Sequence, residues 1–366
     1  MLKPANDTSS AKRYSKKNKI NQEETKLDSE TENGKQLNDY EQSKPLQLAL
    51  FEFLQPEEKH YSNTIELYDF MPKYYWGKAD RINGKFLEVL DREFECRGKK
   101  YKIEIAPAVI TDSDGIKRYY YPSKREELVE EALRRFATAK QGVFLDDVAS
   151  VTFSLYQLQQ ELKQNGHSYS IKQLKDSLLI CAKTSVTVTS DDGSAILVSN
   201  LFETLGLQTR EDWKGTKTKS KAFVRFNALV TESMKNGTYR QLNYEKSMSY
   251  KSVIARQLHK RMSHHYTQAS IAQPYHILLS TIIRDFGLTE YDKPSHNLRN
   301  VLKALNEMKE QEVLLSYKVE KTLDINNRNK TTDGKLILTP HPKFAGEVIQ
   351  GNKRQGRVTH MLNEST

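Results

Sequence analysis

Twice in this sequence, two amphipathic helices separated by a short turn are followed by two runs that favour β-strands. The helix-forming stretches carry apolar residues at helical spacing and end at glycines or turns. The expected elements are helices at 151–166 and 170–184 with strands within 185–202, then helices at 274–288 and 294–311 with strands at 312–322 and 334–340. The second half therefore repeats the first in the order of its elements, which predicts two domains of one kind in tandem.

Helix, turn, helix and hairpin in this order is the outline of a winged helix. We therefore predict an α+β fold with two tandem winged-helix domains, preceded by a small β element. That element is expected from strands at 86–94 and 99–108 and from a second hairpin at Asp-Ser-Asp-Gly. A further helix at 123–142 begins with a Ser123–Glu126 capping box and has an apolar face made of Leu128, Val129, Ala132, Leu133 and Phe136.

The first 45 residues mix Lys, Asn, Glu, Ser and Thr with almost no branched apolar side chains. Such a segment buries too little surface to offset the entropy of ordering, and we expect it to be disordered. The predicted boundaries are 1–45 for this tail, 46–121 for the β-rich extension, 122–212 for the first winged helix, 213–355 for the second and 356–366 for a flexible C-terminal tail.

The positive charge of the chain is concentrated in one segment. The chain has 57 Lys and Arg against 47 Asp and Glu, a net charge of +10. Residues 213–265 hold twelve basic side chains against Glu232 and Glu245, whereas residues 1–45 hold nine basic and eight acidic ones. A positive patch in a folded region indicates a polyanion such as nucleic acid as the partner, with an acidic protein as the alternative.

The stretch 248–270 lies at the end of this segment and contains no acid. On a helical wheel Tyr250, Ile254, Leu258 and Met262 form an apolar row. The other side carries polar residues, and we expect it to point outward against DNA phosphates; the predicted phosphate contacts are Lys217, Lys219, Lys221, Lys251, Arg256, His259, Lys260, Ser263 and His264. The spacing of its three histidines does not converge on one point, so no metal site is expected.

The second helix of each repeat is the candidate for reading DNA sequence, because in helix-turn-helix proteins that helix enters the major groove. Arg and Asn side chains match the edges of guanine and adenine. In the second repeat, where Ser295 is the expected N-cap, the candidate base contacts are His296, Asn297, Arg299, Asn300 and Lys303, and in the first repeat the candidate DNA contacts are Lys172, Gln173 and Lys175. A solvated helix face without a partner is the alternative.

Signatures of enzymes are largely missing. No Gly-x-x-x-x-Gly-Lys-Ser/Thr phosphate loop occurs, which disfavours an ATP-driven enzyme. A nicking enzyme would need a tyrosine, and Tyr119, Tyr120 and Tyr121 are available, but the His-hydrophobic-His metal pair is absent. We therefore expect no catalytic residue and no cofactor.

Two distant cysteines, Cys96 and Cys181, and the lack of an apolar run of about eighteen residues favour a cytosolic protein without a membrane span. The polar N-terminus likewise shows no secretory signal.

Several long stretches resemble the RepA-type plasmid replication initiators, especially those of A/C incompatibility plasmids, and more distantly the TrfA-like initiators. They include FVRFNALV at 223–230, the segment YRQLNYEKSMSYKSVIARQLHKRMSHHYTQAS at 239–270, and stretches between REELVEEALRRF and LFETLGL within 125–207. The resemblance runs from about residue 68 to residue 355 and leaves out the N-terminal tail.

This resemblance implies a bacterial protein with two winged-helix domains that binds direct repeats, called iterons, at a replication origin. It also implies opening of the adjacent duplex, contact with the exposed single-stranded DNA, and recruitment of the host's initiator and replicative helicase without ATP hydrolysis. The C-terminal domain would make the main major-groove contact through residues 295–311, with residues 247–266 against the phosphates. The N-terminal domain would serve a second contact and a homodimer off DNA.

Two alternatives come from other classes. A transcriptional repressor of the same architecture would bind a single inverted repeat over a promoter, whereas an initiator would bind repeats arrayed in one direction. A nicking enzyme would cleave a strand with a divalent metal and would lose that activity when Tyr119, Tyr120 and Tyr121 are changed.

Overall fold

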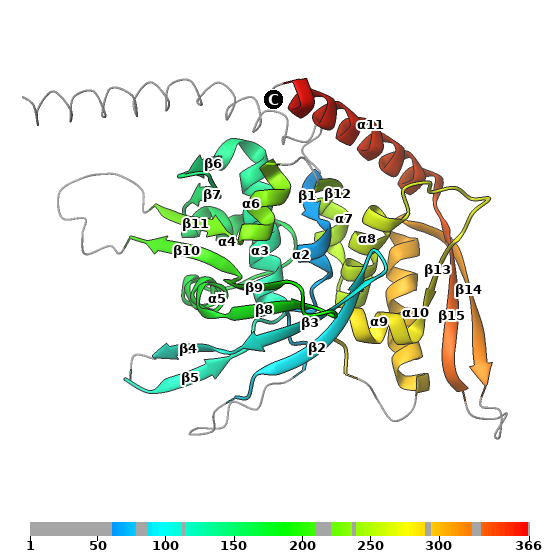
Figure 1. Cartoon of the computed structure of the whole chain (residues 1–366), viewed down its shortest axis with the longest axis horizontal. Helices are drawn as coiled ribbons and strands as arrows, with labels where there is room; N and C mark the ends of the chain where they lie inside the picture. The colour runs from blue at the N-terminus through cyan, green and yellow to red at the C-terminus, as the bar shows by residue number, and fades with distance from the viewer. Residues whose placement is uncertain are drawn as a thin grey trace, which may run out of the picture. The chain divides into compact units, whose positions relative to one another are not determined.

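The computed structural model describes residues 61–77, 87–111, 114–208, 221–235, 239–289, 294–323 and 331–364 (Figure 1). These residues belong to one compact unit. They combine helices with antiparallel sheets, which confirms the predicted α+β class. None of the helices in these ranges is long and apolar enough to cross a membrane. The predicted tail at 1–45 lies outside the described residues.

The N-terminal element contains the two predicted hairpins. Strands β2 (Leu90–Cys96) and β3 (Lys99–Ala106) form the first hairpin, and β4 (Ala108–Thr111) and β5 (Lys117–Tyr120) form the second. Arg97 and Gly98 join β2 to β3 with φ angles of 51° and 74°. Positive φ at both residues is what a two-residue hairpin turn requires to match the twist of its strands. Before them, β1 (Tyr61–Ile65) pairs with the distant β12 (Tyr239–Asn243) and leads into α2 (Glu66–Phe70).

The first module, residues 124–200, follows this element. It consists of α3 (Lys124–Phe136), the π-helical turn η1 (Ala137–Gln141), β6 (Gly142–Leu145), β7 (Val148–Phe153), α4 (Leu155–Gln164), α5 (Ile171–Lys183), β8 (Ser185–Ser190) and β9 (Ile196–Asn200). The helix predicted at 123–142 ends at Phe136. The helix predicted at 151–166 begins only at Leu155, because residues 148–153 pair as a strand with β11 (Ala222–Phe226) and Ser154 caps the helix.

The sheets tie the first module to its surroundings. The β2–β3 hairpin extends the β8–β9 hairpin into a four-stranded sheet of order β2-β3-β8-β9. Strand β10 (Phe202–Leu207) joins β11 in a second sheet of order β10-β11-β7-β6. Helices α6 (Ala228–Lys235) and α7 (Tyr244–Ser249) then lead to the second half.

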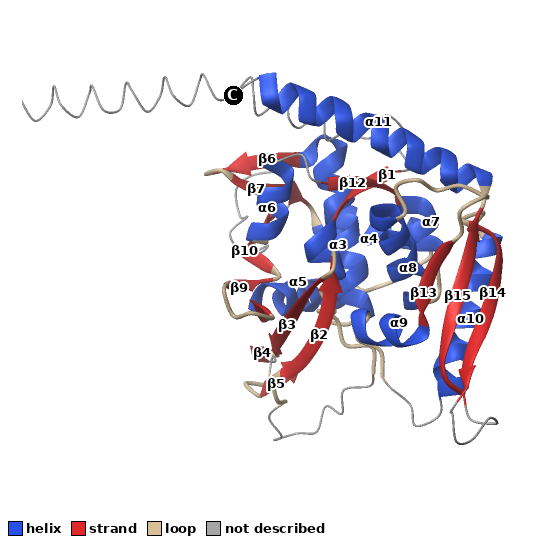
Figure 2. Ribbon diagram, turned by 45° about the vertical axis from the view of Figure 1, so that its right-hand side comes forward, coloured by secondary structure: helices blue, strands red, loops and turns tan. Residues whose placement is uncertain are grey.

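The second module, residues 253–340, is built in the order helix, strand, two helices and hairpin. Its elements are α8 (Val253–His265), β13 (Tyr275–Leu278), α9 (Leu279–Asp285), α10 (Pro294–Glu310), β14 (Leu314–Leu323) and β15 (Thr331–Pro340), with sheet order β13-β15-β14 (Figure 2). Its core packs Leu258 and Met262 of α8 against Val301 and Leu305 of α10 and Leu336 of β15. Burial of such side chains stabilises a module by about 1.5–3 kcal/mol each.

Three predictions for this half are corrected. The helix predicted at 274–288 begins as β13 and becomes helical only at Leu279, because β13 pairs with β15. Ser295 is not the N-cap of α10, since Pro294 before it is already helical, a position that proline favours. Residues 356–364, predicted as flexible, continue α11 (Pro342–Glu364), the red helix in Figure 1.

Helix α3 is the most enclosed helix of the first module. Its apolar face is buried as predicted, yet four carboxylates are buried with it: Glu126, Glu127, Glu130 and Glu131. A buried carboxylate is costly unless a cation and hydrogen bonds compensate it. Glu126 pairs with Arg125, and Glu130 pairs with Arg134 and Lys73. The cations for Glu127 and Glu131 come from α8.

Candidate nucleic-acid interface

Helix α10 buries one face and exposes the other. Leu298, Val301, Leu305 and Met308 are buried, as the sequence predicts. On the other face His296, Arg299 and Lys303 are exposed and Asn300 is half-buried. Asn297 departs from the prediction, because it is only 3% exposed and does not lie on the outward face of α10 with the other four residues.

The β14–β15 hairpin packs against α10 and adds further cations. Lys318 and Lys321 are exposed on β14, and Lys335 is half-buried on β15. Glu320 binds Lys318 at 2.9 Å and faces Lys335 across the strands. Arg299, Lys303 and Lys321 have no carboxylate partner among the residues that the structure describes, so this side of the module can bind an anion.

The corresponding helix of the first module, α5, presents a weaker surface. Lys172 and Gln173 are exposed and Lys175 is half-buried. The side chain of Gln173 accepts a hydrogen bond from the backbone N–H of Ser170 at 2.8 Å, and the Ser170 hydroxyl accepts one from the N–H of Gln173 at 3.2 Å. This capping box fixes Gln173 at the helix start, so its amide is committed to the fold.

The prediction that the polar face of α8 points outward is wrong. Each of the predicted phosphate contacts on α8 is buried: Arg256 (0% exposed), His259 (1%), Lys260 (3%), Ser263 (7%) and His264 (5%). The apolar row of Tyr250, Ile254, Leu258 and Met262 is buried as well, as expected. The helix is thus enclosed on both faces, and a DNA phosphate cannot reach these cations in this structure.

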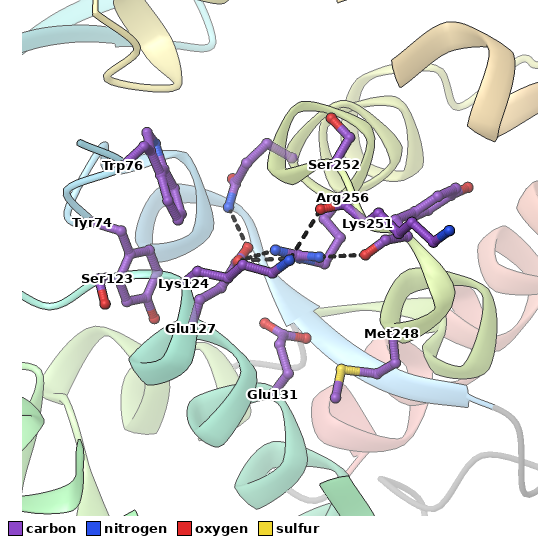
Figure 3. A network of polar contacts seen from close by, with 12 residues as sticks. Tyr74, Trp76, Ser123, Lys124, Glu127, Glu131, Met248, Lys251, Ser252 and Arg256 are labelled. Carbon is purple, nitrogen blue, oxygen red and sulfur yellow. Dashed lines mark hydrogen bonds and ion pairs between the residues drawn. The ribbon is translucent and has the colours of Figure 1, made fainter. Parts of the chain in front are cut away.

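The polar face of α8 is buried against the acidic face of α3 (Figure 3). The Arg256 guanidinium donates to Glu127 through Nη2 at 2.8 Å and Nε at 3.1 Å, and through Nη1 to the Tyr250 carbonyl at 2.7 Å. One turn on, Lys260 Nζ donates to Glu131 Oε1 at 2.5 Å. Both pairs join residues 129 positions apart in the sequence. We call the contact formed by Glu127, Glu131, Arg256 and Lys260 the joint.

Opposite charges in the joint stabilise the ionised forms of Glu127 and Lys260. Burial alone raises the pKa of Glu127, but Arg256 and Lys260 outweigh it and place that pKa below its usual range. For Lys260, burial lowers the pKa, while Glu131, Asp69 and Glu127 together raise it above the ordinary lysine value. Removing one partner of such a pair leaves a buried charge uncompensated, which makes the joint a strong structural constraint.

The buried histidines pack as neutral rings. His259 lies between the rings of Tyr250 and Phe344, with centroid distances of 5.8 and 5.7 Å. Burial, reinforced by Lys246 and Lys260, lowers the pKa of His259 to about 3. Burial also lowers the pKa of His264 to about 4, although Asp69 and Glu66 oppose the shift. Among the described residues, no three His, Cys, Asp or Glu side chains are grouped to hold a metal ion.

The other predicted phosphate contacts divide into two groups. Lys221 and Lys251 are exposed and remain available to an anion. Lys217 and Lys219 lie outside the described residues. The exposed anion-binding side chains therefore belong mainly to α10 and the β14–β15 hairpin and only marginally to the start of α8.

The sequence did contain a signal for the joint. The four buried glutamates of α3 occur as two adjacent pairs spaced by four residues, which places them along one side of a helix. A helix with four aligned acids and a helix with aligned cations are natural partners. The charge of residues 213–265 does not by itself show that α8 pairs with α3, so the sequence analysis did not predict the joint.

No family model matches the sequence, and no curated protein matches it. Among solved structures, a crystal structure of domains 2 and 3 of RctB is 12% identical, with 73% of this chain and 94% of that one covered and a TM-score of 0.45. A second structure of RctB domains 2–3 is 9% identical, with 77% and 99% covered and a TM-score of 0.45. The Pi initiator protein in complex with iteron DNA is 12% identical, with 59% and 90% covered and a TM-score of 0.40.

Proposed function

We propose that this chain binds duplex DNA through α10 and the β14–β15 hairpin of the second module. The observation that carries the proposal is the outer face of α10. Arg299 and Lys303 are exposed there without a carboxylate partner among the described residues, while the opposite face of the same helix is anchored in a core. A rigid helix with an unopposed cationic face suits the polyanionic groove of DNA.

The residues of α10 suit recognition of bases as well as phosphates. An α-helix fits the major groove, where Arg donates two hydrogen bonds to guanine and Asn makes two with adenine. Arg299 is exposed and Asn300 half-buried on α10, and Lys321 on the hairpin is exposed. We assign base contacts to Arg299 and Asn300 and phosphate contacts to Lys303 and Lys321.

The proposal extends to the architecture and to the biological role. Both modules are interpreted as winged helices, with the second as the main DNA-binding domain and the first as a second contact and a dimerisation domain. The sequence resemblance supports a non-enzymatic bacterial replication initiator of the cytoplasm that binds direct repeats, opens the origin and recruits the host initiator and helicase. It would use no cofactor.

Fluorescence anisotropy tests the DNA-binding proposal. The full chain is titrated against labelled duplexes that tile its own gene and flanks, over a salt series with random competitor DNA. Tight binding to one fragment that contains direct repeats supports the initiator, and tight binding to a single inverted repeat over a promoter supports a repressor. Equal weak binding to every fragment, abolished by moderate salt, contradicts sequence-specific recognition by α10.

A further inference from the structure

A cleft of about 590 Å³ lies between the N-terminal element and the second module. One wall is formed by Trp76 and by Arg92 of β2, and the opposite wall by Arg284 of α9 and Asn297 in the first turn of α10. The volume is within the range of sites that bind small ligands. None of the functions considered above uses this cleft, although it adjoins the start of the proposed recognition helix.

Asn297 brings an unsatisfied hydrogen-bond donor to the cleft. Its side chain is only 3% exposed, and its Nδ2 atom has no hydrogen-bond partner among the residues that the structure describes. A buried amide donor without an acceptor is destabilising, and such groups are rare in folded proteins. A ligand that supplies an acceptor oxygen would remove this deficit.

Arg92 brings a cation that is held in position without a counter-ion. Its Nη1 atom donates to the backbone carbonyls of Pro72 and Tyr74, the latter at 2.7 Å. The guanidinium passes closely over Gly287, where a Cβ atom would lie 2.6 Å from Nη1. Within the described ranges, no carboxylate forms an ion pair with Arg92. Burial accordingly lowers the pKa of Arg92, although the neighbouring tyrosines oppose the shift.

Two other charged groups of the cleft, Arg284 and Asp333, are already satisfied by the protein. Arg284 binds Asp285 at 2.6 Å and Glu95 at 3.3 Å. The carboxylate of Asp333 accepts from the backbone N–H and the hydroxyl of Ser280, at 3.1 and 2.7 Å. Glu93 also lines the cleft, where it would repel an anion, but it is exposed, so solvent and salt screen this repulsion. Among the donors of the cleft, Arg92 therefore lacks a counter-ion, and Asn297 Nδ2 lacks any partner among the described residues.

We propose that this cleft binds a phosphate ester, with the Arg92 guanidinium and the Asn297 amide as donors and Trp76 beside the attached group. The first turn of the 17-residue α10 adds the positive end of its helix dipole to the same place. The phosphate is either a DNA backbone phosphate, in which case the inference rests on the proposed function, or that of a free nucleotide. Under this proposal the N-terminal element takes a direct part in ligand binding through Trp76 and Arg92.

Trp76 provides a local reporter for the test. The chain has two tryptophans, so Trp213→Phe leaves Trp76 as the single indole fluorophore. This background chain is titrated with deoxyadenosine monophosphate, with inorganic phosphate, and with the duplex found by anisotropy. The test variant is Asn297→Asp, which replaces the free donor with a carboxylate of the same shape. Asn306→Asp is the matched control, because it makes the same change on an exposed position of α10.

A saturable change of Trp76 fluorescence with the mononucleotide, retained in Asn306→Asp and reduced at least tenfold in affinity in Asn297→Asp, assigns the cleft to a free nucleotide. A change produced only by duplex DNA, with a salt slope that Asn297→Asp lowers by about one phosphate contact, assigns it to the DNA backbone. If duplex binds by anisotropy while Trp76 responds to no titrant and Asn297→Asp keeps the slope, the inference fails and the proposed function stands. If the mononucleotide binds at Trp76 but no duplex binds, the inference stands and the proposed function fails.

Discussion

The two modules share the sequence of helix, helix and hairpin but differ in what they expose. The outer face of α10 carries Arg299 and Lys303, and the adjoining hairpin adds Lys321. In the first module, the β8–β9 turn exposes Asp191 and Asp192, and the edge strand β9 exposes Ile196 and Val198 at 67% and 65%. The surface of α10 and its hairpin suits DNA, whereas the acids at the tip of the β8–β9 hairpin would repel phosphates.

The difference shows that element order alone does not identify a DNA-binding surface. A hairpin packed beside a helix defines only the fold of a module. The charges on its surface decide whether the module can bind a polyanion. The exposed apolar edge of β9 is instead the kind of surface that pairs with another protein chain. The joint between α3 and α8 holds the two modules together. Because both modules belong to one folded chain, a surface substitution in one module can be compared with a substitution in the other.

Loss of the joint is expected to have the largest effect. Glu127→Gln leaves the Arg256 guanidinium buried without its counter-ion and should lower the free energy of unfolding by about 3–5 kcal/mol. The exposed Glu203→Gln is the control and should change it by less than about 0.5 kcal/mol. Urea unfolding at pH 7 measures both. A loss below 1 kcal/mol for Glu127→Gln would show that the modules do not depend on the joint.

Substitution of the recognition helix is expected to separate the modules by function. Arg299→Ala should weaken binding to the specific duplex by about 1–3 kcal/mol and affect random DNA far less. Lys172→Ala on α5 is the matched change in the first module, and we expect a smaller loss there. Anisotropy on specific and random duplexes gives both values. Equal losses at the two positions would remove the functional distinction between α10 and α5.

Acid should weaken the fold around α8. His259 and His264 have folded-state pKa values of about 3 and about 4, well below the unfolded value of about 6.5. The unfolded chain therefore binds more protons between these values, and stability falls as the pH is lowered from 6.5 toward 4. Each histidine contributes up to about 1.4 kcal/mol per pH unit.

The variant His259→Phe keeps a ring between Tyr250 and Phe344 but cannot titrate. It should lower the pH dependence of the unfolding free energy by about one proton in this range, as chemical denaturation at several pH values would show. Phe344→Leu is the control, because it disturbs the same packing without removing a titrating group. An unchanged slope in His259→Phe would mean that His259 is protonated in the folded protein.

The smallest effect is expected at the hairpins. Lys321→Ala should reduce the salt dependence of DNA affinity by about 0.9, the value for one phosphate contact. Asp192→Ala at the tip of the β8–β9 hairpin should leave that dependence unchanged, because this tip is placed away from phosphates in our account. A larger effect at Asp192 than at Lys321 would reverse the roles of the two hairpins.

Features set by neighbouring residues were predictable from the sequence. The capping box at Ser123, the helix start at residue 170, the β2–β3 turn and the buried stripe of α10 all depend on contacts within a few positions. The capping box at Ser154 is equally local, but it was not recognised, and the helix was predicted to begin at residue 151 instead of Leu155. The strand at 148–153 was missed although it forms a hairpin with β6 across the two-residue turn Asp146–Asp147, and its other partner, β11, lies about seventy residues away. Local patterns cannot show which distant strand is available for pairing.

The largest error, the orientation of the polar face of α8, has the same origin. A helical wheel separates apolar from polar residues, but it treats the polar side as exposed. Arg256 and Lys260 are buried because α3 presents Glu127 and Glu131 at matching positions 129 residues earlier. Asn297 illustrates the limit on a smaller scale, since its position near the start of α10 was predicted but its burial depends on the N-terminal element.

The most direct test of the account is lysine labelling of the full chain by reductive methylation, with and without the specific duplex, read by mass spectrometry. We predict that Lys303 and Lys321 react in the free protein and are strongly protected by DNA, that Lys172 and Lys175 are protected less, and that Lys260 is unreactive in both states. Protection of Lys172 and Lys175 in place of Lys303 and Lys321, or reactive Lys260 that DNA protects, would contradict it.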